Sequence, residues 1–331
     1  MYRNSLFYSI FLLSVFVFSC KKEMRIDAPG NLVPKTVDQN SSLPSIVING
    51  AKLHAETFGN PGDPIIFILH GGPASDYRYL LNCRELADNG YFVVFYDQRG
   101  TGLSQRFPRS YYTGIQTSFD DLNGVIAHYR KSAAQKIFLL GHSWGAMLAG
   151  AYINQYPNAV DGAVLAEPGG LKWKDVDDYV KRSRKMDITG EALNNATYMD
   201  QFLTGKEDEH AILDYKYKLL ASTGDENENV GNEGLLPFWR SGFVLQDVYF
   251  DLIKKENSDW TTHLNRFTTK ILFIYSERNK AYGLAHAEKV SAAFPNVQLF
   301  ETKAAGHDML SFSTGWNNTL PTILNYFNAL K

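Results

Sequence analysis

The chain has 331 residues, of which 44% are hydrophobic and 21% are charged, and this composition excludes a fibrous or wholly disordered protein. Basic and acidic side chains nearly balance, for a formal net charge of −2, which argues against a nucleic-acid partner because phosphate binding requires an excess of Lys and Arg. Two cysteines are too few for a disulfide scaffold.

The first twenty residues have the features of a secretory signal. Arg3 gives a basic start, and the apolar run from Leu6 to Phe18 spans about 20 Å as a helix, which is too short for a bilayer core of about 30 Å. Val17-Phe18-Ser19-Cys20 resembles the lipobox of bacterial lipoproteins, in which the cysteine is diacylated. We therefore predict a lipoprotein-type signal peptide over residues 1–20 and a lipid anchor at Cys20. The protein is then expected in the cell envelope, on the periplasmic or surface side of a membrane. The alternative is an ordinary cleaved signal with an incidental cysteine.

The segment after the signal is a candidate tether. Residues 21–43 are polar, contain two prolines and show no hydrophobic period, which predicts a flexible connection. From residue 44 onward, short apolar runs alternate with segments of helical spacing, and Asn49-Gly50 predicts an initial hairpin. Strands are expected at Ser45–Ile48, Leu53–Phe58, Ile65–Leu69, Tyr91–Tyr96, Lys136–Leu140, Ala159–Ala166, Lys270–Tyr275 and Val297–Glu301. Helices are expected at Arg78–Asn89, Thr117–Lys131, Trp144–Tyr156, Leu284–Phe294 and Thr314–Leu330.

Alternation of this kind predicts an α/β fold, with a mostly parallel sheet covered by helices on both faces. The strand signal disappears between residues 171 and 262, where charge is dense and the spacing is mostly helical. We predict that this stretch is a helical lid. It would be inserted between a first part of the core, residues 44–170, and a second part, residues 263–331.

Gly141-His142-Ser143-Trp144-Gly145 fits the G-x-S-x-G nucleophile elbow, and it lies between an apolar strand and a helix, as that motif requires. The glycines leave room for a sharp turn that exposes the Ser143 hydroxyl above the sheet. The backbone N–H of Trp144 would then point toward a developing oxyanion. A second donor is expected from His70-Gly71-Gly72-Pro73, and Gly72 is the candidate because proline has no N–H.

These motifs carry a family resemblance. Together with Asp97-Gln98-Arg99-Gly100-Thr101-Gly102-Leu103-Ser104 and Gly306-His307, they resemble the proline iminopeptidase group of the α/β-hydrolase superfamily. The resemblance implies the α/β-hydrolase fold, and it implies that Asp97 and Arg99 belong to the scaffold. It covers both parts of the core but not the insert.

The base is expected to be His307, which follows Gly306 just after the last apolar strand. A loop at that place lets the imidazole approach Ser143. The base must take the serine proton and return it to the leaving group, and a side chain with a pKa near neutrality does this best.

The acidic residue that would orient His307 is harder to assign from the sequence. Superfamily members often carry an Asp after the strand that corresponds to residues 271–275, but this chain has Asn279 there, and an amide cannot stabilise an imidazolium by charge. Glu167 ends the preceding core strand, at the edge where open α/β sheets gather their sites, and it keeps the order Ser, acid, His. We predict Glu167 as the acid, with Asn279 as a vestigial partner and Glu277 in reserve. A helix cap, an anchor for a substrate ammonium and a surface charge are the other interpretations of Glu167.

The predicted function is a serine hydrolase that cleaves an amide or ester bond through an acyl-enzyme. An aminopeptidase acting on short peptides is the leading interpretation; a carboxylesterase acting on small esters and a catalytically weakened binding module are the alternatives. The pattern predicts no cofactor and no metal, because no His, Asp and Glu cluster has ligand spacing. The resemblance implies that lid carboxylates bind the substrate ammonium, and the insert offers Glu207, Asp208, Glu209, Asp225, Glu226, Glu228, Glu233 and Asp247.

Overall fold

The computed structural model describes residues 32–183, 208–223 and 230–331. The predicted signal peptide and Cys20 lie outside these residues. Within the described part, no helix is both long enough and apolar enough to cross a membrane.

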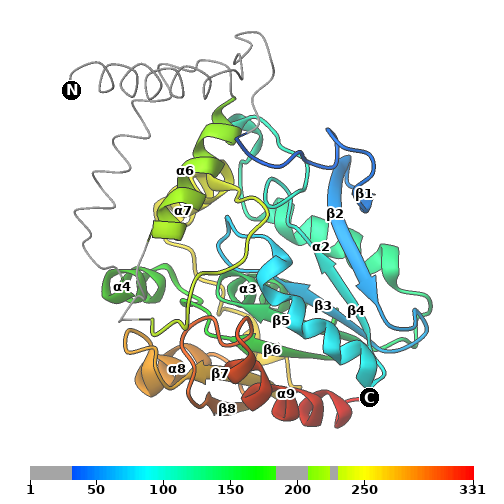
Figure 1. Ribbon diagram of the computed structural model, residues 1–331. Coiled ribbons are helices and arrows are strands. Elements are labelled where there is room, and N and C mark those ends of the chain that lie inside the picture. The colour runs from blue at the N-terminus through cyan, green and yellow to red at the C-terminus, as the bar shows by residue number, and fades with distance from the viewer. Residues whose placement is uncertain (1–31, 184–207, 224–229) are drawn as a thin grey trace, which may run out of the picture. The chain divides into compact units, whose positions relative to one another are not determined.

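An eight-stranded sheet forms the centre of the described chain, in the order β1-β2-β4-β3-β5-β6-β7-β8 (Figure 1). The pairs β1–β2 and β2–β4 are antiparallel, and every other neighbouring pair is parallel. This topology confirms the predicted α/β fold. The strands are β1 (Ser45–Ile48), β2 (Ala51–Phe58), β3 (Ile65–Leu69), β4 (Phe92–Tyr96), β5 (Ile137–His142), β6 (Gly162–Ala166), β7 (Ile271–Ser276) and β8 (Val297–Thr302).

Helices cover both faces of the sheet, and the central strands are therefore buried on both sides. One face packs against α2, α3 and α8, with Phe67 and Leu139 pointing to it, and the other packs against η1 and α9, with Ile66 and Leu140. The helices around the sheet are the 3₁₀ helix η1 (Tyr77–Asn89), α2 (Gln116–Tyr129), α3 (Trp144–Gln155), α8 (Gly283–Ser291) and α9 (Ser313–Asn328), with the short 3₁₀ turns η2 (Arg109–Tyr111) and η3 (Leu264–Arg266).

The hairpin predicted at Asn49-Gly50 is confirmed. Ile48 pairs with Ala51 across the turn, and both turn residues have a positive φ, of 47° and 77°. Asparagine and glycine tolerate this left-handed backbone better than other residues, which is why the dipeptide marks the turn so reliably.

The structure differs from the predicted flexible tether over the part of residues 21–43 that it describes. Thr36 and Val37 are buried, and the Val37 N–H donates a hydrogen bond of 2.8 Å to Leu103 O. Pro34 O accepts a hydrogen bond of 3.0 Å from Arg240 Nη1. The packed core therefore extends back to Thr36 rather than beginning at residue 44, because this segment finds buried partners that its local sequence does not reveal.

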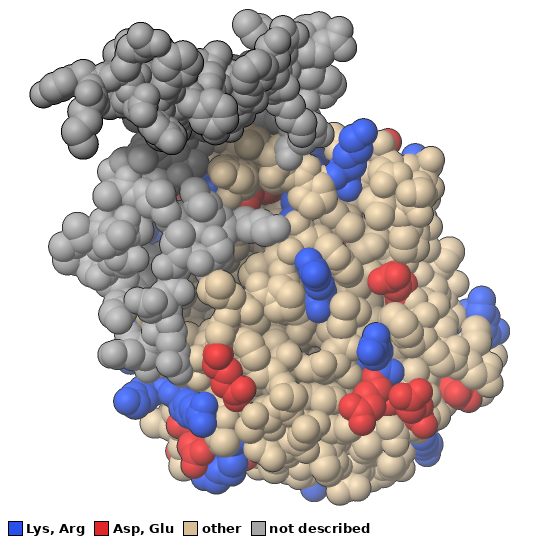
Figure 2. Space-filling model, in the orientation of Figure 1, with Lys and Arg blue, Asp and Glu red and all other residues tan. Residues whose placement is uncertain are grey.

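The insert, residues 171–262, holds three described helices: α4 (Trp173–Ser183), α6 (Glu209–Thr223) and α7 (Phe243–Glu256). Among its described residues the only β structure is an isolated bridge between Lys172 and Asp259. The helices α6 and α7 pack side by side (Figure 1). On the face shown in Figure 2, basic and acidic side chains of the described residues are interspersed rather than separated into patches.

Candidate active site

Ser143 lies on a sharp turn between β5 and α3. Its backbone has φ 54° and ψ −119°, a conformation that costs free energy for any residue with a side chain. The turn is held by the Ser143 N–H, which donates a hydrogen bond of 2.8 Å to Ala166 O. The side chain stays partly exposed at the end of the strand, as a nucleophile requires.

The two glycines of the elbow are required by close packing. A Cβ on Gly141 would lie 2.3 Å from Gly145 O, and a Cβ on Gly145 would lie 1.9 Å from Leu69 O. Both distances are far shorter than van der Waals contact, so no larger residue fits. The first turn of α3 can therefore pack closely against β3 and β5, which places the N-terminus of the helix beside Ser143.

Glu167 and His307 meet directly. Glu167 Oε2 is 2.6 Å from His307 Nδ1, and the carboxylate is fully buried whereas the imidazole is 15% exposed. Glu167 follows β6, and His307 belongs to the loop after β8. Only β7 separates these two parallel strands, so their carboxyl ends lie at the same edge of the sheet and the two residues can meet. A carboxylate only accepts hydrogen bonds, so Nδ1 carries the proton and Nε2 has a free lone pair.

The remaining lone pairs of Glu167 are also used. Its Oε1 accepts hydrogen bonds from the N–H and the hydroxyl of Ser276, at 2.7 and 2.6 Å. Asn279 Nδ2 donates to Oε2 at 2.7 Å, so the residue at the usual acid position holds Glu167 in place. These contacts join β6, β7 and the His307 loop.

Glu277, the reserve candidate for the acid, is not part of this cluster. Its carboxylate is 45% exposed and accepts hydrogen bonds from Lys303 Nζ at 3.1 Å and from the Ala304 N–H at 2.8 Å. The side chain of Glu277 points away from the sheet interior, whereas Ser276 and Asn279, on either side of it in the sequence, are buried.

Opposing effects act on the pKa of His307. Burial lowers it, but the hydrogen bond and the charge of Glu167, with a contribution from Asp308, outweigh burial and raise the pKa above its ordinary value. Glu167 therefore stabilises the imidazolium form, which is the form that a general base acquires during catalysis. Within the structure no hydrogen bond joins Ser143 Oγ to His307, and such bonds commonly tighten only when substrate is bound.

Two backbone N–H groups are available near Ser143. Neither the Gly72 N–H nor the Trp144 N–H has an acceptor among the described residues. Gly72 has φ 118°, which strongly favours glycine, and a Cβ on the preceding Gly71 would lie 3.1 Å from Ser143 Cβ. The loop thus runs directly beside Ser143.

Gln98 fixes the loop to the elbow. Its N–H donates to His70 Nε2 at 3.0 Å, and its Nε2 donates to His70 O at 3.0 Å. Its Oε1 accepts a hydrogen bond of 3.0 Å from Trp144 Nε1. The sequence motif around Gln98 pointed to a scaffold role but not to this bridge.

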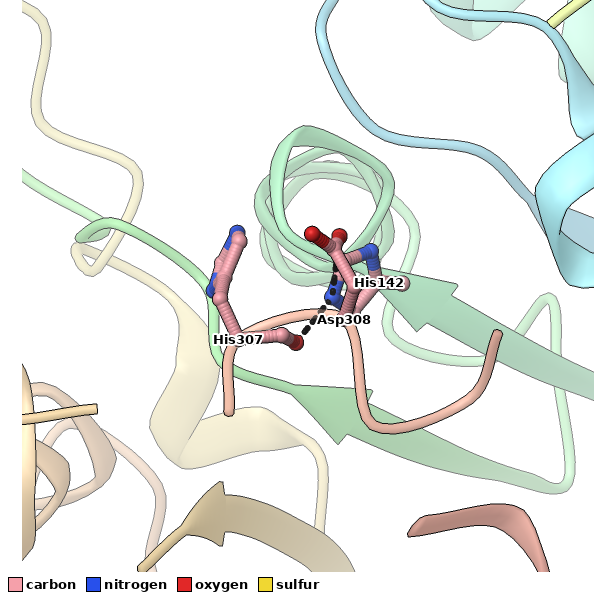
Figure 3. A group of neighbouring side chains, drawn as sticks. All are labelled: His142, His307 and Asp308. Atoms are coloured by element: carbon pink, nitrogen blue, oxygen red, sulfur yellow. Dashed lines mark hydrogen bonds and ion pairs between the residues drawn. The ribbon is translucent and has the colours of Figure 1, made fainter. Parts of the chain in front are cut away.

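A second bridge runs through Tyr79 and His142. The Gly71 N–H donates to Tyr79 Oη at 2.7 Å, and Tyr79 Oη in turn is 2.8 Å from His142 Nδ1. The other ring nitrogen of His142, Nε2, donates to His307 O at 2.7 Å (Figure 3). The loop that carries Gly72 and the loop that carries His307 are therefore joined by one chain of hydrogen bonds, which sequence reasoning missed because Tyr79 belongs to no motif.

His142, His307 and Asp308 also place ligand-type atoms within 4.8 Å of one another (Figure 3). Both ring nitrogens of His142 already take part in hydrogen bonds, and His307 Nδ1 binds Glu167. Burial, and then the charge of His307, lower the pKa of His142 to about 3, so His142 stays neutral. The donor set fits a hydrogen-bond network rather than a metal ion, since His142 has no free lone pair to offer.

Comparison with known proteins identifies a family whose profile matches this chain. The profile of the family described as serine aminopeptidase, S33, matches residues 60–227. Epoxide hydrolase B of Mycobacterium tuberculosis is 33% identical over 117 residues, which are 35% of this chain and 32% of that protein. The proline iminopeptidase of Thermoplasma volcanium is 35% identical over 106 residues, 32% of this chain and 34% of that protein. The matched segment thus spans about a third of the length of these relatives.

Solved structures agree on the fold. The crystal structure of VinJ has a TM-score of 0.59 at 17% identity and covers 87% of this chain and 98% of that one. The proline iminopeptidase of Mycobacterium smegmatis has a TM-score of 0.56 at 16% identity, over 86% of this chain and 99% of that one. Because the family profile spans just over half of the sequence and the sheet has the matching topology, the chain belongs to the serine aminopeptidase family S33 of the α/β-hydrolases.

Proposed function

We propose that this hydrolase works through a serine nucleophile, with Ser143 as nucleophile, His307 as base and Glu167 as acid. The observation that carries the proposal is the 2.6 Å contact between Glu167 and His307 Nδ1, at the same sheet edge as the Ser143 elbow. A nucleophile, a base and a group that orients the base form the constellation that acyl transfer needs.

The proposed reaction has two stages. Ser143 Oγ attacks the carbonyl carbon, its proton passes to His307 Nε2, and the carbonyl electron pair moves to the oxygen. The N–H groups of Gly72 and Trp144 donate hydrogen bonds to the resulting oxyanion. Removal of one such donor typically costs about 10²–10³ in rate. The oxyanion then collapses, the carbon–nitrogen or carbon–oxygen bond breaks, and the leaving group takes the proton from His307. Water, deprotonated by the same imidazole, releases the acyl group.

An aminopeptidase acting on short peptides is the activity that we favour. The S33 family profile and the proline iminopeptidase relative support this choice. An epoxide hydrolase matches a similarly short part of the chain, so the proposed activity does not rest on the relatives alone. It rests on Ser143, Glu167 and His307, which together supply a nucleophile, an acid and a base.

A fluorophosphonate probe tests the nucleophile. Stoichiometric labelling of the wild-type protein that is lost in Ser143→Ala is expected, and an unlabelled wild-type protein would favour a binding module instead. Substrate class is tested separately with prolyl- and alanyl-naphthylamides beside short p-nitrophenyl esters. Hydrolysis of the naphthylamides is expected, whereas turnover of the esters alone would make the protein a carboxylesterase.

A further inference from the structure

Asp308 is a buried acidic side chain that the proposed reaction does not use. It follows His307 in the same loop, and only 5% of its surface is exposed. Its carboxylate and the imidazole of His307 project to the same side of the loop (Figure 3). Asp308 therefore lies on the side of the molecule where the base would act.

Among the side chains that the structure describes, no Lys or Arg pairs with the Asp308 carboxylate. The basic groups beside it are His307, which offers a ring nitrogen within 4.8 Å, and His142, whose Nε2 is 3.9 Å from Asp308 Oδ1. That nitrogen donates its proton to His307 O, and His142 is held neutral, so the contact is not an ion pair. The Asp308 N–H is fixed by a hydrogen bond of 3.1 Å to Asn232 Oδ1, which anchors its backbone.

An unpaired carboxylate at this depth is costly. Burial raises the pKa of Asp308 to about 6, although the charge of His307 opposes this rise. The charge of Glu167 adds to the rise, and a hydrogen bond with the Asn232 side chain opposes it. The carboxylate is thus buried beside His307, and no described Lys or Arg balances its charge. Burial of such a charge is tolerated when a cation pairs with it, and a ligand can supply that cation.

The candidate lid carboxylates that the structure describes are less suited to this task. Glu209 and Asp247 both pair with Arg109, and they are 52% and 45% exposed. Asp208 Oδ1 accepts a hydrogen bond of 2.8 Å from the Ala211 N–H at the start of α6. Glu233, the fourth of these carboxylates that the structure describes, is exposed. Asp308 differs from all four because it is buried, has no described Lys or Arg partner and adjoins the base.

We propose that Asp308 binds the free ammonium group of the residue at the amino terminus of the substrate. The assignment rests on the proposed function, since it takes Ser143 as the attacking group. In an amino-terminal residue a single carbon separates the ammonium nitrogen from the scissile carbonyl carbon, so the two must be bound close together. Asp308 meets this condition because it adjoins His307 and approaches His142, the residue before Ser143. The ligand class is a primary or secondary ammonium.

The direct test compares alanyl-2-naphthylamide with its N-acetyl analogue, which has no positive charge. Asp308→Asn is expected to lower kcat/KM for the free amine by roughly 10- to 100-fold, the usual value of a charged hydrogen bond. Its kcat/KM for p-nitrophenyl acetate is expected to fall by a smaller factor than that for the free amine, because Asp308 affects an uncharged ester only through the pKa of His307. Equal losses on the amine and the ester would overturn the proposal, because Asp308 would then act only through His307.

Glu277→Gln is the matched control, since Glu277 is an exposed carboxylate that contacts Ala304 in the same loop. It is expected to leave the preference for the free amine unchanged. Fluorophosphonate labelling of Asp308→Asn shows whether the site is intact, and Asp308→Ser is the second variant if the amide disturbs folding. A loss of amine preference in Glu277→Gln equal to that in Asp308→Asn would also count against Asp308.

A third measurement separates this proposal from the peptidase activity. Alaninamide and the uncharged propionamide are compared as inhibitors of p-nitrophenyl acetate hydrolysis by the wild-type protein. An ammonium subsite predicts inhibition by alaninamide at least about tenfold stronger, even if no naphthylamide is cleaved and the aminopeptidase assignment fails. Equal inhibition by the two amides would refute the subsite while leaving the serine mechanism untouched.

Discussion

At the scale of single residues, Glu167 organises the site through the number of its hydrogen bonds. It accepts from Ser276, Asn279 and His307, so both carboxylate oxygens are occupied and the side chain has one orientation. The imidazole is in turn restricted to one tautomer, with Nε2 free. Asn279 contributes through Glu167, which explains why an amide serves at a position where related enzymes often carry an acid.

The role of Glu167 gives the first prediction. Glu167→Gln should lower kcat by about 10⁴, the cost known for losing the acid of a triad. It should also shift the pH profile. Glu167 raises the pKa of His307, and activity requires the neutral imidazole, so loss of the charge lowers this pKa and moves the acid limb to lower pH. The pH dependence of kcat/KM measures both effects.

Glu277→Gln is the control for this pH profile, since its carboxylate faces solvent beside Lys303. We expect its profile to match that of the wild-type protein. If Glu277→Gln instead lost several orders of magnitude in kcat while Glu167→Gln did not, the acid would be wrongly assigned.

Tyr79 gives the second prediction. Its hydroxyl accepts from the Gly71 N–H and donates to His142 Nδ1, so Tyr79→Phe leaves two buried polar groups without partners. An unsatisfied buried group costs about 1–3 kcal/mol, and we expect a loss of that size in the free energy of unfolding. We also expect kcat to fall about tenfold with KM little changed, because the Gly72 loop would lose its fixed position relative to Ser143, a loss that falls on the transition state.

Tyr91→Phe is the matched variant for that measurement. Tyr91 also donates a partly buried hydrogen bond, of 2.8 Å to Asn328 Oδ1. It directly precedes β4, at the opposite end of that strand from the site. It should lower stability and leave kcat unchanged. A similar fall in kcat in both variants would mean that Tyr79 acts through general stability alone.

Sequence patterns pointed to the residues of the proposed triad more readily than to the contacts that hold them. Ser143, Glu167 and His307 were predicted because each follows an apolar strand, and parallel strands align their carboxyl ends. The contacts of Tyr79, Gln98 and Asp308 were missed because their partners are distant in the chain: Tyr79 and His142, for example, are 63 residues apart. No local periodicity encodes a contact of that kind.

At the scale of elements, the strands and helices of the core were predictable because burial on two faces produces continuous apolar runs. The contacts that attach the insert to the core were not predictable from the sequence. In α6, the buried Asp214 accepts hydrogen bonds from Arg240 Nε at 2.7 Å, from Arg106 Nη2 at 3.1 Å and from the Phe243 N–H at 3.0 Å. The dense charge and helical spacing of the insert predicted a helical lid, but they did not predict that one of its carboxylates is buried between Arg240 and Arg106.

Asp214 gives the third prediction. Asp214→Asn leaves two buried guanidinium groups without their counter-charge, and breaking a buried pair typically costs about 3–5 kcal/mol. We expect the free energy of unfolding in urea to fall by that amount. Asp247→Asn removes an exposed pair with Arg109 and should cost at most about 1 kcal/mol. Equal losses in the two variants would contradict the buried anchor.

At the scale of the whole molecule, the described chain begins to pack at Thr36, and the carbonyl of Pro34 binds Arg240 from the insert. The prediction of a tether failed there because a polar segment with prolines can still bury a few side chains, such as Val37, against a folded core. The composition of a segment is a local property, whereas whether the segment takes up a fixed structure also depends on the protein surface against which it packs.

The lipid anchor at Cys20 remains our proposal for how the protein is held at a membrane, and it gives the last prediction. Cys20→Ala should abolish palmitate labelling and release the protein from the membrane fraction, because each buried methylene of an acyl chain contributes about 0.8 kcal/mol. Cys83→Ser is the control: Cys83 is buried and burial raises the pKa of its thiol, so it is shielded and poorly nucleophilic. Labelling that survived Cys20→Ala would refute the anchor, since acylation of this chain would then depend on another group.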